Sequence, residues 1–93
     1  MAVIARLHGY LQQLSGGMTA SDLQQLLVAR LVRERGGTSQ TWRRALGKVI
    51  LRDAKTHPHC NWEVRPSGTD AQHAAIEELL DEVRLKYSNV TAD

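Results

Sequence analysis

Hydrophobic residues recur every three or four positions in four segments of this chain, which predicts four amphipathic helices. The first helix is expected over residues 3–14, where one face carries Val3, Ile4, Leu7, Leu11 and Leu14. Gly16-Gly17 would end it, because glycine accepts the left-handed conformation found at helix C-termini. The second helix is expected to begin at Thr19-Ala20-Ser21-Asp22, which offers capping side chains, and to end at Gly36-Gly37.

The third and fourth helices each begin with a capping side chain. We expect the third helix to start at Thr38 or Ser39 and to direct inward Trp42, Ala45, Leu46 and Val49. The fourth helix starts after Thr69, which can form a capping box with Gln72. Its apolar stripe consists of Ile76, Leu79, Leu80, Val83 and Tyr87. Residues 88–93 are expected to be a frayed tail.

Residues 60–65 alternate between apolar and polar side chains, which is typical of a half-buried strand. A strand needs a hydrogen-bonding partner. The nearest candidate is residues 49–54, which could equally finish the third helix. The two strands would form a hairpin with its tip at residues 55–59, and a short segment around Met18 could add a third strand.

The expected fold is therefore mainly α with a small β-hairpin (α+β), in the order helix-helix-helix-hairpin-helix. We expect one globular domain over residues 1–88 and a flexible tail over residues 89–93.

The composition fits a single ordered domain, since the 93 residues are 42% hydrophobic and 24% charged. The sequence has no Phe, so Trp42 and Trp62 are expected in the core. Cys60 is the only cysteine, which rules out an intramolecular disulfide.

The N-terminal segment lacks the apolar run of a signal peptide, and no segment approaches the ~20 apolar residues that cross a bilayer. A cytoplasmic protein without membrane contact is expected.

Charge is divided unevenly along the chain. Residues 30–55 contain only two acidic residues, Glu34 and Asp53. The same range contains eight basic residues: Arg30, Arg33, Arg35, Arg43, Arg44, Lys48, Arg52 and Lys55. From residue 70 to 86 the acidic residues predominate: Asp70, Glu77, Glu78, Asp81 and Glu82. A clustered basic surface is the usual footprint of a polyanion partner. The same division would suit a protein-interaction module, such as an adaptor or inhibitor, and the arginines could also pair with the acidic helix.

The order of the predicted elements resembles the winged helix-turn-helix family over roughly residues 1–66. The resemblance implies that the third helix lies in the major groove of DNA, while the hairpin wing contacts the DNA backbone. The implied nucleic-acid-binding residues of the helix are Thr38, Ser39, Gln40, Arg43, Arg44 and Lys48, and those of the hairpin are Arg52, Lys55, His57 and Arg65. Small polar residues and arginines suit contacts to phosphates and base edges. The last helix would support the domain or form a homodimer.

A second resemblance concerns the sequence Arg65-Pro66-Ser67-Gly68-Thr69, which is similar to the phosphate-gripping loop of the phosphohexomutase family. That resemblance implies a small anion site beside Arg65 and a helix N-terminus. The same residues also form an ordinary strand-to-helix turn with an N-cap, and we favour this interpretation.

Side chains with metal-binding or nucleophilic chemistry are few. His57, His59, Cys60 and His73 are zinc-ligand types, but neither a Cys-x-x-Cys nor a His-x-x-x-His pair organises them. His59 and Cys60 are neighbours on a predicted strand and would face opposite ways, which argues against a catalytic dyad. We therefore expect a small non-catalytic binding domain, not an enzyme, with no metal and no cofactor. DNA is its most favoured partner.

Overall fold

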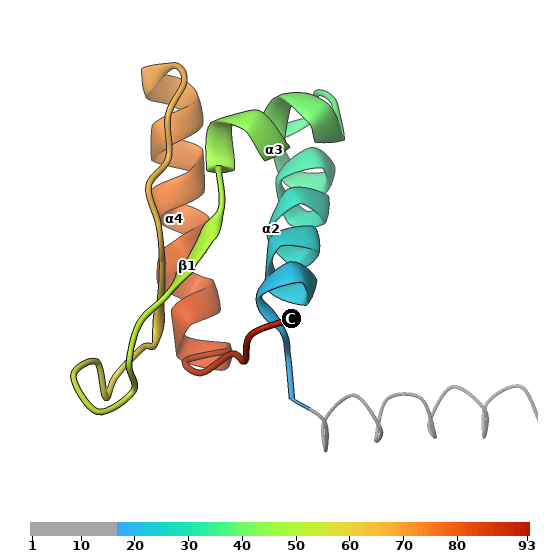
Figure 1. The fold of residues 1–93 in the computed structure, drawn as a ribbon. Helices are drawn as coiled ribbons and strands as arrows, with labels where there is room; N and C mark the ends of the chain where they lie inside the picture. The colour runs from blue at the N-terminus through green and yellow to red at the C-terminus, as the bar shows by residue number, and fades with distance from the viewer. Residues whose placement is uncertain (1–16) are drawn as a thin grey trace, which may run out of the picture.

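The computed structural model describes residues 17–93, and in this part the chain forms three helices and one antiparallel pair of strands (Figure 1). The elements are α2 (Ala20–Arg35), α3 (Ser39–Leu46), β1 (Val49–Leu51), β2 (Trp62–Val64) and α4 (Asp70–Lys86). This is the predicted α+β class. The helix predicted over residues 3–14 lies outside the described residues.

The predicted capping side chains set the start of each described helix. The Thr19 hydroxyl accepts a hydrogen bond from the Asp22 N–H to cap α2, and the Thr69 hydroxyl accepts one from the Gln72 N–H to cap α4. In both helices the second side chain of the pair completes a capping box. Thr38, not Ser39, caps α3 by accepting from the Thr41 N–H.

The end of the third helix, which the sequence left open, lies before residues 49–54. The helix ends at Leu46 because Gly47 adopts a φ of +77°, a left-handed conformation that favours glycine. Val49 was predicted to lie on the inward face of this helix. It instead pairs with Val64 as the first residue of β1, so the segment that could have been helix or strand is a strand. The segment around Met18, which could have added a third strand, is not part of the described two-stranded sheet, and next to it Thr19 forms an isolated parallel bridge with Thr91.

The core lies between the three described helices and the inner face of β2. Figure 1 shows α2 and α4 upright with α3 across their upper ends, and each pair of these helices is in contact. Both tryptophans are buried, and each donates its indole N–H to a backbone carbonyl: Trp42 to Gly36 and Trp62 to Tyr87, both at 2.7 Å. The apolar stripe of α4, including Ile76 and Leu80, is also buried in this core.

Residues 88–93, for which a frayed tail was expected, make specific contacts with the domain. Val90 is only 4% exposed, and the Asn61 side chain bonds to both its N–H and its carbonyl oxygen. The Thr91 N–H donates to the Met18 carbonyl, and the Thr91 carbonyl accepts from the Ala20 N–H. These partners are distant in sequence, so the local pattern of residues 88–93 could not reveal them.

Among the described helices, none is long and apolar enough to cross a membrane.

Candidate nucleic-acid interface

The short helix α3 has one buried face and one exposed basic face. Its sequence, SQTWRRAL, contains no acidic residue, and it buries Trp42, Ala45 and Leu46. Successive helical residues are about 100° apart, so packing Trp42 inward turns Arg43 and Arg44 towards solvent. The exposed predicted site residues of this region are Thr38, Ser39, Gln40, Arg43, Arg44 and Lys48. The Thr38 hydroxyl is already engaged as the N-cap of the helix.

The base of the hairpin adjoins the C-terminal end of α3. Val49 pairs with Val64, so extending this antiparallel register by one residue places Lys48 opposite Arg65. Both valines face inward, and since side chains alternate along a strand, Lys48 and Arg65 lie on the outer face. A β-carbon at Gly47 would lie 3.7 Å from the Arg65 carbonyl oxygen, which shows how close the end of α3 lies to the end of β2. The structure therefore brings Lys48 and Arg65 to the end of α3 that carries Arg43 and Arg44.

The tip of the hairpin lies elsewhere. Figure 1 shows the loop between β1 and β2 at the opposite end of the described domain from α3. Asp53 shapes this loop, because its carboxylate accepts from the Lys55 N–H and its carbonyl accepts from the N–H groups of Thr56 and His57. Lys55 and His57 are exposed here. The two predicted tip residues are thus not part of one patch with α3.

Several of the predicted basic residues are paired, and the pairs with the acidic helix come from α2. Arg30 contacts Glu34 and also Glu82 of α4. The hydrogen bond to Glu34, and to a lesser extent that to Glu82, raises the pKa of the Arg30 guanidinium above its ordinary value. Arg35 contacts Glu78 of α4 at 2.7 Å. The predicted alternative, in which arginines pair with the acidic helix, therefore holds for these two arginines of α2.

Ion pairing on the hairpin involves a single carboxylate. Arg52 contacts Glu63, and the Arg65 guanidinium lies 3.5 Å from the same Glu63 oxygen. No ion pair within residues 17–93 involves Arg43, Arg44 or Lys48. The patch formed by Arg43, Arg44 and Lys48, which we call the α3 patch, thus carries uncompensated positive charge. Lys55 is also unpaired within residues 17–93, but it lies apart from this patch at the hairpin tip.

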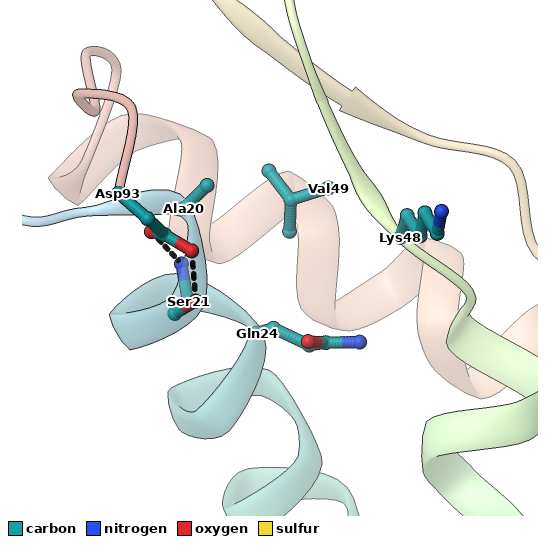
Figure 2. A pocket seen from close by; sticks show the side chains of 6 residues that line it. All are labelled: Ala20, Ser21, Gln24, Lys48, Val49 and Asp93. Atoms are coloured by element: carbon teal, nitrogen blue, oxygen red, sulfur yellow. Dashed lines mark hydrogen bonds between the residues drawn. The ribbon is translucent and has the colours of Figure 1, made fainter.

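A small open hollow of about 180 Å³ lies between the start of α2, the start of β1 and Asp93 (Figure 2). The Asp93 carboxylate accepts hydrogen bonds from the N–H and the hydroxyl of Ser21, which lowers the pKa of Asp93. Figure 2 shows the Lys48 amine directed away from these two residues. The chain itself thus occupies the polar groups of Ser21 at this helix end, and Lys48 belongs with the α3 patch.

The turn over residues 65–69 uses its polar groups internally. The Ser67 N–H donates to the Ala45 carbonyl at 2.7 Å, which ties the turn to α3. The Thr69 N–H donates to Gln72, and the Thr69 hydroxyl accepts from the Gln72 N–H. The geometry is that of a strand-to-helix turn with a capping box.

Metal-binding residue types do not gather in the described part of the chain, where no three His, Cys, Asp or Glu side chains form a group that could hold an ion. Cys60 is half-buried against the core, and its thiol points at the Trp62 carbonyl at 3.3 Å.

One relevant residue, Glu63, was not among the predicted site residues. Glu63 contacts two predicted DNA-binding arginines. Alternation along residues 60–65 already indicated that Glu63 faces outward, but its contact with Arg52 depends on the strand register, which the sequence pattern did not define.

Comparisons of this chain with protein-family models, with curated proteins and with solved structures each find no significant match.

Proposed function

We propose that this protein is a small nucleic-acid-binding domain whose α3 patch contacts the phosphates of duplex DNA. The observation that supports this proposal most strongly is the α3 patch itself. It consists of three exposed cations on or directly after a helix that contains no acidic residue, and none of the three has an ion pair within residues 17–93, while arginines of α2 pair with α4. An uncompensated basic surface attracts polyanions and neutralises their phosphates.

A winged helix-turn-helix architecture is the finer proposal. The connection between α2 and α3 is residues 36–38, and α3 is followed directly by the hairpin. This connection is compact because α2 extends to Arg35. In this interpretation α3 would be the DNA-contacting helix, and α4 would support it, because the apolar stripe of α4 is already used in the chain's own core.

Duplex DNA is a better candidate ligand than single-stranded nucleic acid. Sequence-tolerant single-strand binding depends on exposed aromatic rings on which bases stack. Trp42 is 7% exposed and Trp62 is 2% exposed, so neither ring offers such a surface. Phosphate contacts by arginine and lysine do not need one.

The test is the affinity of the full chain for a short DNA duplex, measured by fluorescence anisotropy at several salt concentrations. If the α3 patch contacts three phosphates, the slope of log affinity against log salt should be about −2.7, at about −0.9 per phosphate. Replacing Arg43 and Arg44 by Gln should reduce that slope by about 1.8 and weaken binding at low salt. Thermal stability should change little, because exposed substitutions usually alter stability within ~0.5 kcal/mol.

A variant with the same net charge serves as the control. Arg33→Gln with Lys86→Gln removes two exposed cations from α2 and α4. Equal loss of affinity in the two double variants would show a general charge effect and refute the α3 patch as the contact surface. No binding of the unaltered chain, even at low salt, would refute the DNA-binding proposal as a whole.

A protein-interaction module is the second candidate, and Leu85 favours it. This α4 side chain is 88% exposed, with exposed Asp81 and Glu82 on the same helix. The carboxylates beside this leucine would repel a phosphate backbone and suit a protein partner instead. A stoichiometric protein partner that survives nuclease treatment and is lost in Leu85→Ser would favour this second function.

A further inference from the structure

Glu63 occupies a central position among the basic residues of the hairpin. It lies on β2 between the inward-facing Trp62 and Val64, so it faces outward. Arg52 follows the last residue of β1, and alternation from Leu51, which pairs with Trp62, places it on the same outer face. Arg65 follows the last residue of β2, and the same alternation from Val64 places it on this face too.

One carboxylate is thus shared by two guanidinium groups. Arg52 contacts Glu63, and Arg65 Nη2 lies 3.5 Å from the same Oε1 atom. Arginine holds a phosphate with two hydrogen bonds, using the donors that also hold a carboxylate. A DNA phosphate at this position would therefore compete with Glu63 for the two arginines.

We infer that Glu63 is a specificity-determining residue that limits phosphate binding by Arg52 and Arg65, so that only closely docked DNA engages the hairpin. This inference rests on the proposed function and deepens it. It assigns the α3 patch as the first contact and the hairpin arginines as a second set that Glu63 restrains.

The opposite effect, in which Glu63 aids binding by positioning the arginines, is smaller. The side chain of Arg65 is 73% exposed, so its pair with Glu63 contributes little to ordering, while Arg52 and Glu63 are 34% and 35% exposed and form the less exposed pair. Glutamine at position 63 also keeps an oxygen that can accept from arginine. Removing the negative charge is therefore the larger consequence of Glu63→Gln.

The experiment compares the full chain with Glu63→Gln for binding to the same DNA duplex. Each additional phosphate contact adds about −0.9 to the slope of log affinity against log salt. At 0.1 M salt this corresponds to an affinity about eightfold higher. We expect Glu63→Gln to bind about five- to tenfold tighter there, with a salt slope steeper by about 0.9. Circular dichroism checks that the variant retains its helices.

The matched control is Glu78→Gln, the same change at an exposed glutamate of α4 that also pairs with an arginine. Its effect should stay within about twofold, because Glu78 pairs with Arg35 of α2 and with none of the predicted DNA-binding arginines. An equal gain in both variants would overturn the inference, since it would reflect net charge alone.

A second measurement does not depend on the folding of Glu63→Gln. In a chain that keeps Glu63, Arg65→Gln should weaken DNA binding less than Arg44→Gln does, because Glu63 already restrains Arg65. An Arg65→Gln loss as large as that of Arg44→Gln would overturn the inference. If the unaltered chain binds DNA and Glu63→Gln binds equally, the inference alone fails. If neither protein binds DNA, the proposed function fails with it.

Discussion

Replacing Asn61 by Ala should destabilise the protein, because this side chain holds residues 88–93 against the domain. Its amide group donates to the Val90 carbonyl at 2.7 Å and accepts from the Val90 N–H at 2.9 Å. The backbone groups of Asn61 make separate hydrogen bonds, with the Ser88 carbonyl and the Arg52 N–H, and alanine would keep them. The substitution therefore isolates the contribution of the side chain.

The expected loss in the free energy of unfolding depends on how the structure responds to Asn61→Ala, and two responses are possible. If Val90 stays in place, two hydrogen bonds worth about 0.5–1.5 kcal/mol each are lost, and two buried backbone groups lose their partner. If the segment detaches instead, water satisfies these groups, but the burial of Val90, worth about 1.5–3 kcal/mol, is lost. Since the chain takes the cheaper route, we expect a loss of about 2 kcal/mol in the free energy of unfolding.

Thermal and urea unfolding measure this loss. For a domain of this size about 2 kcal/mol corresponds to a decrease in Tm of roughly 8–16 °C. Trp62 fluorescence reports the same region, because its indole N–H donates to the carbonyl of Tyr87, next to the segment. Asn89→Ala is the control, since Asn89 is exposed and its amide reaches only the Ser88 hydroxyl, at 3.4 Å. Equal stability of the two variants would refute the reasoning.

Two further predictions concern other hydrogen bonds of the domain. Trp42→Phe keeps a buried aromatic ring but removes the N–H that donates to the Gly36 carbonyl, so it should cost about 1–2 kcal/mol; an unchanged urea midpoint would contradict this. Asp93→Asn should reduce the dependence of Tm on pH below about pH 5. Hydrogen bonds from the Ser21 hydroxyl, and next from its N–H, lower the pKa of Asp93 in the folded state. The resulting stability is present above the ordinary aspartate pKa and is lost as the pH falls through the lowered value, so equal losses of Tm on acidification in both proteins would show that Ser21 contributes nothing.

Local signals in the sequence predicted the described helices well. Thr19 with Asp22 and Thr69 with Gln72 form capping boxes, which depend only on residues within one turn. The end of α3 was predicted less well, because Val49, Ile50 and Leu51 suit a helix or a strand equally. Gly47 and the pairing with β2 decide between them, and the pairing is a contact between segments distant in sequence.

The position of the last residues could not be predicted for a related physical reason. Polar residues at a chain end suggest fraying when their own side chains offer no core. In this chain the partners are supplied from elsewhere, by the Asn61 side chain and by the Met18 carbonyl. Val90 alone gave a local sign of burial, and one apolar residue does not predict a packed segment.

The exposure of the candidate residues on α3 was predictable, but the pairing of the arginines was not. The exposed face of α3 follows from the inward position of Trp42, which the helical spacing gives directly. Which carboxylate meets which arginine depends on how the elements pack. The charge of Arg30 and Arg35 is compensated by α4, and that of Arg52 and Arg65 by Glu63.

This division of charge limits how strongly one copy of the chain would hold DNA. The three cations of the α3 patch imply three phosphate contacts and a salt slope of about −2.7. This number of contacts is well below the roughly 6–10 phosphate contacts typical of tight DNA-binding proteins. Two copies on one duplex would double that slope to about −5. The apolar stripe of α4 lies in the core and cannot join two such copies. A measured slope near −5 would therefore indicate either two copies on one duplex, joined through another surface or placed side by side by the DNA, or one copy that also engages Arg52 and Arg65.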